Sequence, residues 1–353
     1  MTGKSNIFNY GLLITIISLI TLINSLYIQN FYFFVVFIFS IIASAISTRY
    51  GIKFIKKYNF LQTIRDEGPS SHFSKNKTPT MGGLFIIPLF FLLVSAISII
   101  SYKFKLVFLL TILGFFFIGF IDDYLSIKNQ INLGLKSKEK LILQIFFSSL
   151  FVIYLSNNNL INNNLILMND LTIDLKNIII PVSIITIISL SNSVNLTDGL
   201  DGLAAGCSSI VFCGLGTEIL LNNDKNLLIF SLLSFCMSGL CLGFLKHNKY
   251  PAKIFMGDTG SLTIGAIIGV ICVITNSFIT TFIISGIFII EALSVILQVS
   301  YFKITKKFFN HGSRLFLMTP IHHHFELKGI KEEKIVEIFW LINITLLIFS
   351  IVM

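Results

Sequence analysis

The stretch FKLVFLLTILGFFFIGFIDD, residues 104–123, joins a long apolar run to two adjacent aspartates. A helix needs about 20 apolar residues to cross the roughly 30 Å of hydrocarbon in a lipid bilayer. The stretch therefore predicts a helix that spans a membrane and delivers a pair of carboxylates to the membrane surface.

Ten more apolar runs of comparable length accompany this one along the 353 residues, of which 54% are hydrophobic and only 12% are charged. A soluble core of this size could not hide so much apolar side chain from water. We therefore expect an all-α polytopic integral membrane protein with no separate soluble domain. The eleven runs are 10–28, 31–50, 82–100, 104–121, 141–156, 177–192, 202–222, 227–245, 260–278, 282–302 and 335–352.

Small residues inside these runs indicate packing. All five cysteines fall within the runs and lack CxxC spacing, so neither a disulfide framework nor a zinc site is indicated. Gly239 with Gly243, and Gly265 with Gly269, have the GxxxG spacing that is typical of closely packed membrane helices.

The basic residues are distributed unevenly between the polar segments. Five of these segments hold 21 of the 26 Lys and Arg, and the positive-inside rule places such segments on the cytoplasmic side. Topology therefore accounts for the net charge of +9 without a nucleic-acid partner. Because the five segments share one face, we expect them to form one active site at the cytoplasmic face. They are 49–81, 122–140, 193–201, 246–259 and 303–334.

Acidic residues in these segments are the first candidates for chemistry. Neighbours on a helix diverge by about 100°, so one of Asp122 and Asp123 could face a reaction centre while the other holds a lysine or a helix terminus. Asp198 and Asp201, in NLTDGLDGLAAG, share a face if their segment is helical, and Asn195 could add a polar contact. A solvated helix end and a glycine-rich hinge are the structural alternatives.

Asp258, in FMGDTGSL, directly precedes another apolar run, where a capping aspartate would also be ordinary. Three acidic clusters at one membrane face repel one another unless a cation offsets their charge. Clustered carboxylate oxygens suit Mg²⁺, especially when substrate phosphates complete its coordination. A magnesium and diphosphate site is therefore the sharper interpretation, and Phe255 beside it could stack on a nucleobase.

Two further segments supply the opposite charge. One contains His72, Lys75 and Lys77, and the other contains Arg314 and the run His322–His324. Successive side chains splay apart and HExxH spacing is absent, so three adjacent histidines do not indicate zinc. Phosphate binding or proton transfer by one imidazole fits better, with attraction to anionic lipid as the alternative for the lysines.

Glu291 lies deep within an apolar run, where an ionisable residue is functional or is paired with a neighbouring polar group. A transporter would be expected to gather its polar residues near the bilayer midplane. Because only Glu291 is deep, an enzyme at the membrane surface, joining a water-soluble phosphorylated donor to a lipid, is favoured over a transporter.

Five motifs resemble, in the same order, those of the phospho-N-acetylmuramoyl-pentapeptide transferases, membrane enzymes that make lipid I for peptidoglycan. The likeness extends from about residue 31 to the C-terminus. Transferases that attach GlcNAc phosphate to polyprenyl phosphate share the aspartate motifs and are the alternative, but the triple histidine and TPTMGG favour the muramoyl-pentapeptide family. The motifs are SHFSKNKTPTMGG (71–83), GFIDDY (119–124), NSVNLTDGLDGLA (192–204), FMGDTGSL (255–262) and MTPIHHHFELKG (318–329).

The resemblance implies an enzyme of the bacterial inner membrane with its active site facing the cytoplasm, a requirement for Mg²⁺, ten spans and, at the level of the family, a homodimer. Such an enzyme transfers phospho-MurNAc-pentapeptide from its UDP carrier to undecaprenyl phosphate and releases UMP. Direct attack by the lipid phosphate and a covalent enzyme intermediate are both open at this stage.

The resemblance also implies roles for matching residues. Asp258 matches the metal-binding aspartate, and Asp122 and Asp123 match a pair of which one deprotonates or positions the lipid phosphate. Lys140 matches a lysine suited to the diphosphate. The implied catalytic residues are Asp122, Asp123, Asp258, Lys140, His323 and His324.

For the nucleotide, the resemblance implies that Phe255 stacks on uracil and that Asp201 accepts a hydrogen bond from the edge of the base. The full set of implied substrate-binding residues is Lys75, Asn195, Asp198, Asp201, Asn248 and Phe255.

Two features depart from the family pattern. Ser126 stands where the family often has a lysine three residues after the aspartate pair, and Lys128 could substitute for it. The run 10–28 is additional to the ten spans of the family. We expect residues 1–30 to be an extra N-terminal segment, either crossing the membrane or lying along its surface, and residues 31–353 to be one membrane-embedded transferase domain.

Overall fold

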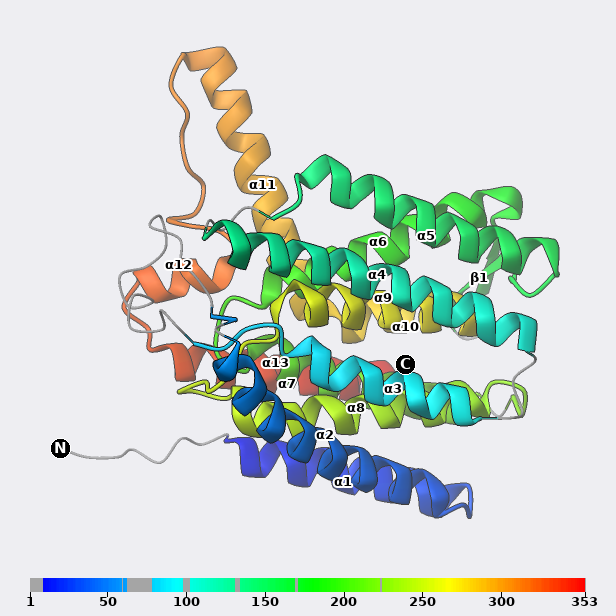
Figure 1. Cartoon of the computed structure of the whole chain (residues 1–353). Coiled ribbons are helices and arrows are strands. Elements are labelled where there is room, and N and C mark those ends of the chain that lie inside the picture. Colours follow the sequence, from blue (N-terminus) through cyan, green and yellow to red (C-terminus); the bar gives the residue numbers. More distant parts are fainter. Residues whose placement is uncertain are drawn as a thin grey trace.

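A computed structural model of the chain is a bundle of helices that run side by side between two ends (Figure 1). It describes residues 9–58, 60–61, 78–97, 102–130, 134–168, 171–222 and 224–352. The helices are α1 (Tyr10–Tyr27), α2 (Tyr32–Lys57), α3 (Gly83–Ala96), α4 (Tyr102–Asn129), α5 (Ser137–Asn157), α6 (Ile179–Thr197), α7 (Leu203–Leu221), α8 (Leu228–Asn248), α9 (Gly257–Thr275), α10 (Phe278–Ile284), α11 (Gly286–Phe309), α12 (Ile321–Leu327) and α13 (Glu332–Val352). The other elements are the strands β1 (Asn164–Met168) and β2 (Leu171–Asp174) and the short 3-10 helix η2 (Lys176–Ile178).

Ten of the eleven apolar runs each fall mainly on one helix, and the run 282–302 begins in α10 and continues into α11, which confirms the all-α polytopic class. In the described part of the chain, ten helices are long and apolar enough to cross a membrane. The eleventh run forms α3, which has 14 residues and is shorter than a usual span. The short helices α10 and α12 and the β1–β2 hairpin are not indicated by the apolar pattern, because none of them is long enough to produce one.

The extra N-terminal run forms α1, which lies against α2, α7 and α8. Asn24 Nδ2 donates to Thr217 Oγ1 of α7 at 2.8 Å, and the Tyr10 hydroxyl donates to the Leu242 carbonyl of α8 at 3.1 Å. Because α1 runs alongside the bundle (Figure 1), crossing the membrane is favoured over lying along its surface. The division of the chain at residue 30 stays a prediction.

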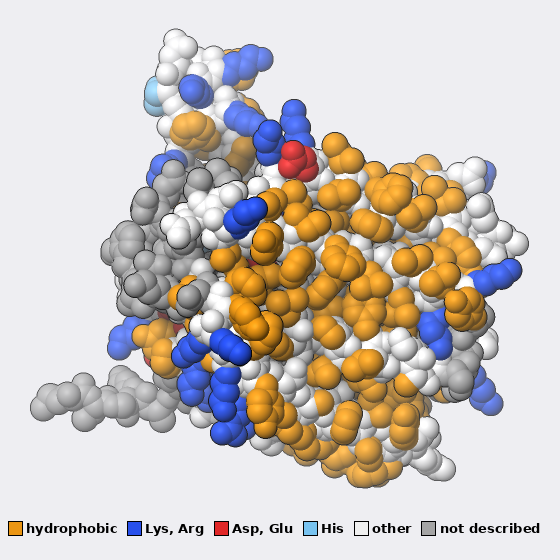
Figure 2. Space-filling model, in the orientation of Figure 1, with side chains coloured by type: hydrophobic (Ala, Val, Ile, Leu, Met, Phe, Trp, Pro, Cys, Tyr) orange, Lys and Arg blue, Asp and Glu red, His pale blue; other side chains and the backbone are white. Residues whose placement is uncertain are grey.

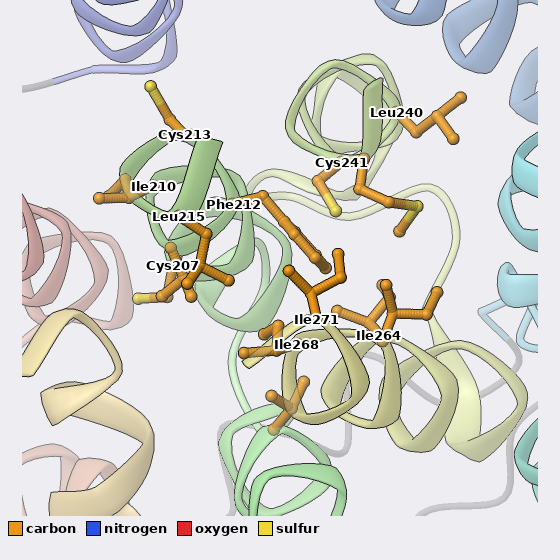
Figure 3. Close-up of a cluster of buried hydrophobic side chains, with 14 of the residues drawn as sticks. Cys207, Ile210, Phe212, Cys213, Leu215, Leu240, Cys241, Ile264, Ile268 and Ile271 are labelled. Carbon is orange, nitrogen blue, oxygen red and sulfur yellow. The ribbon is translucent and has the colours of Figure 1, made fainter. Parts of the chain in front are cut away.

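The buried centre of the bundle is formed by α7, α8 and α9. Figure 3 shows side chains from these three helices, among them Cys207, Phe212, Cys241 and Ile268, gathered in one cluster. A helix that is apolar on all sides is expected where other helices surround it completely. All five cysteines are buried free thiols, which confirms that they serve as packing residues.

Both GxxxG pairs lie where helices meet backbone to backbone, as predicted. A Cβ on Gly239 or Gly243 would lie 2.5 Å or 2.3 Å from a backbone carbonyl oxygen of α2. A Cβ on Gly265 would lie 2.4 Å from the Leu190 carbonyl oxygen of α6. Only glycine permits these close crossings of α2 with α8 and of α6 with α9.

The outer surface suits lipid. Figure 2 shows hydrophobic side chains across the middle of one face, with Lys and Arg toward its edges. Phe117 of α4 and Ile142 and Phe146 of α5 each expose more than half of their surface. A continuous apolar surface of this extent is stable against acyl chains and not against water. The protein is therefore a multi-pass membrane protein.

The two ends of the bundle differ. One end carries the antiparallel β1–β2 hairpin, and Asn276 Nδ2 donates to the Asn164 carbonyl there at 2.8 Å. At the other end the last turns of α4, α6 and α8 meet the first turns of α5, α7 and α9 (Figure 1). The three acidic segments of the sequence therefore meet at this second end.

Two glycines bring the start of α9 into backbone contact with α3 and α4. A Cβ on Gly119 of α4 would lie 2.2 Å from the Asp258 carbonyl oxygen, and a Cβ on Gly83 of α3 would lie 2.3 Å from the Gly260 nitrogen. Because a backbone cannot turn aside as a flexible side chain can, these contacts determine where α9 begins.

We expect Gly119→Ala to destabilise the protein, because the added methyl group overlaps the Asp258 carbonyl. Overpacking of this kind costs about 1–3 kcal/mol, so the thermal unfolding midpoint in detergent should fall. Gly286→Ala is the matched control, since the nearest atoms to its added methyl group belong to the flexible Leu346 side chain. Equal midpoints for the two variants would contradict the packing argument.

Candidate active site

The carboxylate of Asp123 caps the N-terminus of α9. Its Oδ1 accepts the Asp258 N–H at 3.0 Å, and its Oδ2 accepts the N–H and the hydroxyl of Thr259 at 2.9 and 2.6 Å. The first N–H groups of a helix lack partners within the helix, and the helix dipole favours a negative charge at this end. Asp123 therefore holds a helix terminus, which is one of the two roles expected for the aspartate pair.

Asp122, the other member of the pair, faces a lysine and a third aspartate. Lys140 Nζ lies 2.9 Å from Asp122 Oδ1 and 2.7 Å from Asp258 Oδ2. Asp122 Oδ1 also accepts the Leu135 N–H at 2.7 Å. The ammonium group on α5 thus bridges a carboxylate of α4 and a carboxylate of α9.

Asn195, in the last turn of α6, holds the second oxygen of Asp258. Its Nδ2 donates to Asp258 Oδ1 at 2.8 Å and to Ser261 Oγ at 2.9 Å. The Asp258 carboxylate is therefore fixed from two helices, by a lysine on one oxygen and by an amide on the other. Four of the predicted catalytic residues and one of the predicted nucleotide-binding residues meet in this cluster.

We call Asp122, Asp123 and Asp258 the acidic centre. One carboxylate oxygen from each lies within 4.8 Å of the other two, and among the described residues no other group of three or more Asp, Glu, His or Cys side chains could hold a metal ion in this way. Such oxygens suit hard cations. Both oxygens of Asp123 accept bonds from the first residues of α9, whereas Asp122 and Asp258 share the ammonium of Lys140. The sequence indicates only Asp258 as a metal ligand.

The two aspartates of NLTDGLDGLAAG lie in the turn between α6 and α7. Asp198 accepts a hydrogen bond from the Gly257 backbone, one residue before Asp258 of the acidic centre. Asp201 Oδ2 accepts the Ala252 N–H at 2.9 Å. The segment is a turn and not a helix, so the condition for a shared helix face is not met. Asp198 instead ties this turn to the first residue of α9, and Asp201 ties it to the loop before α9.

The environment of Asp198 favours its protonated form. Burial raises the pKa of Asp198 well above its usual value, and the carboxylates of Asp258, Asp123 and Asp201 raise it further. The hydrogen bond from the Gly257 backbone opposes this shift. The charge of the Asp198 carboxyl group therefore depends on the neighbouring carboxylates of Asp258, Asp123 and Asp201.

Asn248 and Phe255 bracket the loop between α8 and α9. Asn248 is buried, and its Nδ2 donates to the Ile254 carbonyl at 2.9 Å. The backbone of Phe255 donates to the Pro79 carbonyl at 2.8 Å and accepts the Gly82 N–H at 2.9 Å. These bonds tie the loop to the residues that lead into α3. Phe255 lies three residues before Asp258 in the sequence, and its ring is half-buried. The two hydrogen bonds fix its backbone.

Glu291, the deep ionisable residue of α11, has a partner in His322. Glu291 Oε2 lies 3.1 Å from His322 Nδ1, and neither side chain has exposed surface. A Cβ on Gly199 would lie 2.3 Å from His322 Nε2, so His322 also lies directly beneath the turn that carries Asp198. The sequence indicates that Glu291 needs a partner but not which one, because the pairing depends on how α12 folds against α11.

His323 and His324 have different neighbours. His323 Nδ1 lies 2.7 Å from Glu326 Oε2, a contact that orients the ring. His324 Nδ1 accepts the Leu317 N–H at 3.1 Å. Loss of hydration and the nearby Lys328 lower the pKa of His324, in accord with a neutral ring that accepts this bond. The three imidazoles do not converge as zinc ligands would.

These contacts do not include several residues that the sequence singles out. Lys75 lies outside the residues that the structure describes, as do His72 and Lys77. Ser126 and Lys128 lie in the last turn of α4, beyond the aspartate pair.

Two acidic partners of the site are missing from the sequence expectations. Glu326 follows His323 by three residues, a spacing that would have indicated the pair once a helix was assumed. Glu332 Oε1 accepts the Asp201 N–H at 2.6 Å, and no local pattern could have indicated that contact across 131 residues.

Comparisons with known proteins agree with one another. Residues 105–276 match the family model of Glycosyl transferase family 4, and residues 75–87 match a phospho-N-acetylmuramoyl-pentapeptide-transferase signature. The chain is 56% identical over 354 residues to the phospho-N-acetylmuramoyl-pentapeptide-transferase of Prochlorococcus marinus strain MIT 9215, with 100% of this chain and 99% of the relative covered. The protein of that name from Clostridioides difficile strain 630 is 41% identical over 306 residues, with 85% of this chain and 91% of the relative covered.

The raised pKa of Asp198 predicts a pH-dependent stability. The folded state binds this proton more tightly than the unfolded state, so stability falls as the pH rises from the unfolded pKa through the folded one. Asp198→Asn removes this dependence and can still accept the Gly257 bond. Without metal or nucleotide, the variant should match the wild type near pH 4 and unfold at a higher temperature at pH 8. A difference that shrinks as the pH rises would refute the assignment.

The unequal roles of the aspartate pair predict unequal losses of stability. Asp123→Ala should lower the metal-free unfolding midpoint, because it removes the three bonds to α9 and loss of a helix cap costs about 0.5–2 kcal/mol. Asp122→Ala should lower it less, because Asp122 caps no helix and both variants relieve repulsion with Asp258. Differential scanning fluorimetry on both variants tests this order, and the reverse order would show that Asp123 is not the cap.

Proposed function

The chain belongs to the phospho-N-acetylmuramoyl-pentapeptide transferase family, and we propose that it transfers phospho-MurNAc-pentapeptide from UDP-MurNAc-pentapeptide to undecaprenyl phosphate. The products are lipid I and UMP, and the reaction is the first membrane step of peptidoglycan synthesis. The observation that carries the chemical part of this proposal is the contact of Lys140 with Asp122 and Asp258 at the end of the helix bundle.

The position of this contact suits a reaction between a water-soluble donor and a lipid acceptor. Lys140 lies in the first turn of α5, and the next two residues, Leu141 and Ile142, expose 45% and 64% of their surface. Such exposed apolar side chains suit contact with acyl chains. The charged cluster therefore adjoins an apolar surface of α5, and we propose that the phosphate of the polyprenyl lipid reaches it from that side.

The donor set of the acidic centre fits the divalent cation that the family uses. We propose Asp258 and Asp122 as protein ligands, because an exchangeable cation, the Lys140 ammonium, bridges their oxygens, while both oxygens of Asp123 are bonded to the helix N-terminus of α9. When bound there, Mg²⁺ would neutralise charge on the donor diphosphate, which is the main requirement of phosphoryl transfer. Asn195 keeps the Asp258 carboxylate in a single orientation through its bond to Oδ1.

Asp122 is the member of the pair that can act on the acceptor. Asp123 accepts three hydrogen bonds from α9, whereas Asp122 contacts Lys140, which also contacts Asp258. We propose that Asp122 positions the lipid phosphate and accepts its proton where one is present. Lys140, as a point charge on a flexible stem, suits the diphosphate of the donor.

The nucleotide half of the site is proposed to lie around the turn between α6 and α7. Asp201 is held by the Ala252 N–H, so its carboxylate is oriented beside the loop that carries Phe255. We propose that the Phe255 ring stacks on uracil and that Asp201 accepts from the edge of the base. Asn248 holds this loop through its bond to the Ile254 carbonyl. Asp198 joins the turn between α6 and α7 to Gly257, the residue before Asp258. Lys75 remains a proposed partner of the nucleotide.

Of the two site histidines, His323 is proposed as the one that exchanges a proton. The contact of Glu326 Oε2 with Nδ1 orients its ring. His324, with its lowered pKa, is proposed as a neutral hydrogen-bonding group.

The cellular setting follows from the family. We propose that the protein lies in the bacterial inner membrane with the acidic end of the bundle facing the cytoplasm, where the donor is made. The excess of Lys and Arg in the segments at that end supports this orientation. A homodimer is proposed on the same family basis.

The proposed activity is tested by release of UMP from purified protein in detergent with undecaprenyl phosphate. UDP-MurNAc-pentapeptide and UDP-GlcNAc are supplied separately, each with Mg²⁺ or with a chelator. Release that needs both the muramoyl donor and Mg²⁺ supports the proposal. Release from UDP-GlcNAc would assign the chain to the GlcNAc phosphate transferases, and release from neither donor by folded protein would reject the proposed activity.

Replacement of the proposed metal ligand should remove most of this activity. We expect Asp258→Asn to lower UMP release by on the order of 10²–10³, the range for loss of one preorganised electrostatic contact. Asp224→Asn is the control, because Asp224 is an exposed aspartate in the loop between α7 and α8. Near-normal turnover of Asp258→Asn with Mg²⁺ present would show that Asp258 is not a ligand.

A further inference from the structure

The ammonium of Lys140 occupies the place between two carboxylates that a shared cation would need. Its Nζ lies 2.9 Å from Asp122 Oδ1 and 2.7 Å from Asp258 Oδ2. Among the described residues it is the one cation bonded to the acidic centre. The other donors are neutral: they are the N–H groups of Leu135, Asp258 and Thr259, the Thr259 hydroxyl and Asn195 Nδ2. Asp122 and Asp258 thus depend on this side chain for compensating charge among the described residues, while Asp123 is bonded to the N-terminus of α9.

A lysine and a divalent cation cannot use these two oxygens at once. Mg²⁺ binds carboxylate oxygens at about 2.0–2.1 Å and demands near-octahedral geometry. An ammonium that stayed on the same two oxygens would lie in contact with the ion, and two positive charges at such a distance repel strongly. One of the two cations must leave when the other binds.

We propose that Lys140 is a resident counter-cation that holds Asp122 and Asp258 together before metal binds, and that it moves to the donor diphosphate when a divalent cation takes its place. The destination of the lysine rests on the proposed function, since the diphosphate belongs to the donor. Its occupation of the cation position rests on the observed contacts alone.

The surroundings of Lys140 allow this movement without a change in the backbone. The first turn of α5 is anchored separately, because Glu139 Oε2 accepts the Lys136 N–H at 3.0 Å and the Lys140 N–H bonds to the Lys136 carbonyl at 3.1 Å. The Lys140 side chain is 22% exposed and its four-carbon stem is flexible. The ammonium can therefore swing away from the carboxylates while α5 stays in place.

The exchange couples two binding events. While Lys140 bridges the two carboxylates, a divalent cation must displace it in order to bind them. A diphosphate then binds weakly, because the ammonium is already engaged by Asp122 and Asp258. Once a cation is bound, the displaced ammonium is available to the phosphate oxygens. Binding of cation and of diphosphate should therefore each strengthen the other, and the coupling must be reciprocal.

The test is metal binding without substrate. Mn²⁺ is titrated into metal-free protein in detergent, and the free ion is measured by electron paramagnetic resonance. Lys140→Met should bind Mn²⁺ roughly tenfold more tightly than the wild type, because a competing positive charge beside the ion is removed. Lys138→Met is the matched control, since Lys138 lies two residues earlier on α5 and is exposed. It should stay within about twofold of the wild type, because solvent and salt screen an exposed charge.

Thermal unfolding separates this role from a merely structural one. Without metal, Lys140→Met should unfold at a lower temperature than the wild type, because the carboxylates lose their counter-cation. Mn²⁺ should then raise its midpoint more than it raises that of the wild type. A lysine that only packs against the site would give a loss of stability that Mn²⁺ does not selectively restore.

The diphosphate step is tested with UDP as the probe. Mn²⁺ should increase the affinity of the wild type for UDP by a larger factor than it does for Lys140→Met. Equal factors would overturn the movement of Lys140 to the diphosphate.

Equal or weaker Mn²⁺ binding by Lys140→Met, or no binding by either protein, would overturn the counter-cation role. These outcomes are independent of the proposed function, which is judged separately by whether the wild type releases UMP from the muramoyl donor.

Discussion

Three carboxylates brought together at the end of a membrane-embedded helix bundle are the constraint on which the rest of the site depends. Their mutual repulsion and loss of hydration would destabilise this end of the bundle unless each negative charge were compensated. The N-terminus of α9 stabilises the charge of Asp123, and the Lys140 ammonium compensates Asp122 and Asp258. The glycine contacts of α3 and α4 with α9 are what allow backbone and carboxylates to approach this closely.

This arrangement explains how one site can serve substrates from two solvents. The acidic centre lies where polar loops meet the apolar surface of α5, so that a nucleotide can approach from water and a lipid phosphate from the membrane. The remaining contacts hold the loops that would surround the nucleotide. Asp198 bonds to the first residue of α9 and Asp201 bonds to the loop before it. His322, paired with Glu291, lies against Gly199 of the turn that carries both aspartates.

The sequence was sufficient for the parts that depend on local pattern. Apolar runs predicted the helices, GxxxG pairs predicted two close crossings, and helix geometry predicted that Asp122 and Asp123 take different roles. Which aspartate takes which role depends on α9, more than 130 residues away, and could not be inferred locally. The same holds for the pairing of His322 with Glu291. The turn at Asp198 could not be predicted either, because the order of apolar and polar residues in such a short segment fits a turn and a helix equally well.

The central claim is that Asp122 and Asp258 hold a divalent cation at the place where Lys140 now lies. The most direct test is a crystal structure of the protein with Mn²⁺ and UDP, in which anomalous scattering locates the metal. We expect a peak about 2 Å from oxygens of Asp258 and Asp122, with the Lys140 ammonium moved onto the diphosphate and Asp123 still bonded to α9. A metal bound to Asp123, or one bound elsewhere while Lys140 still bridges the two carboxylates, would contradict it.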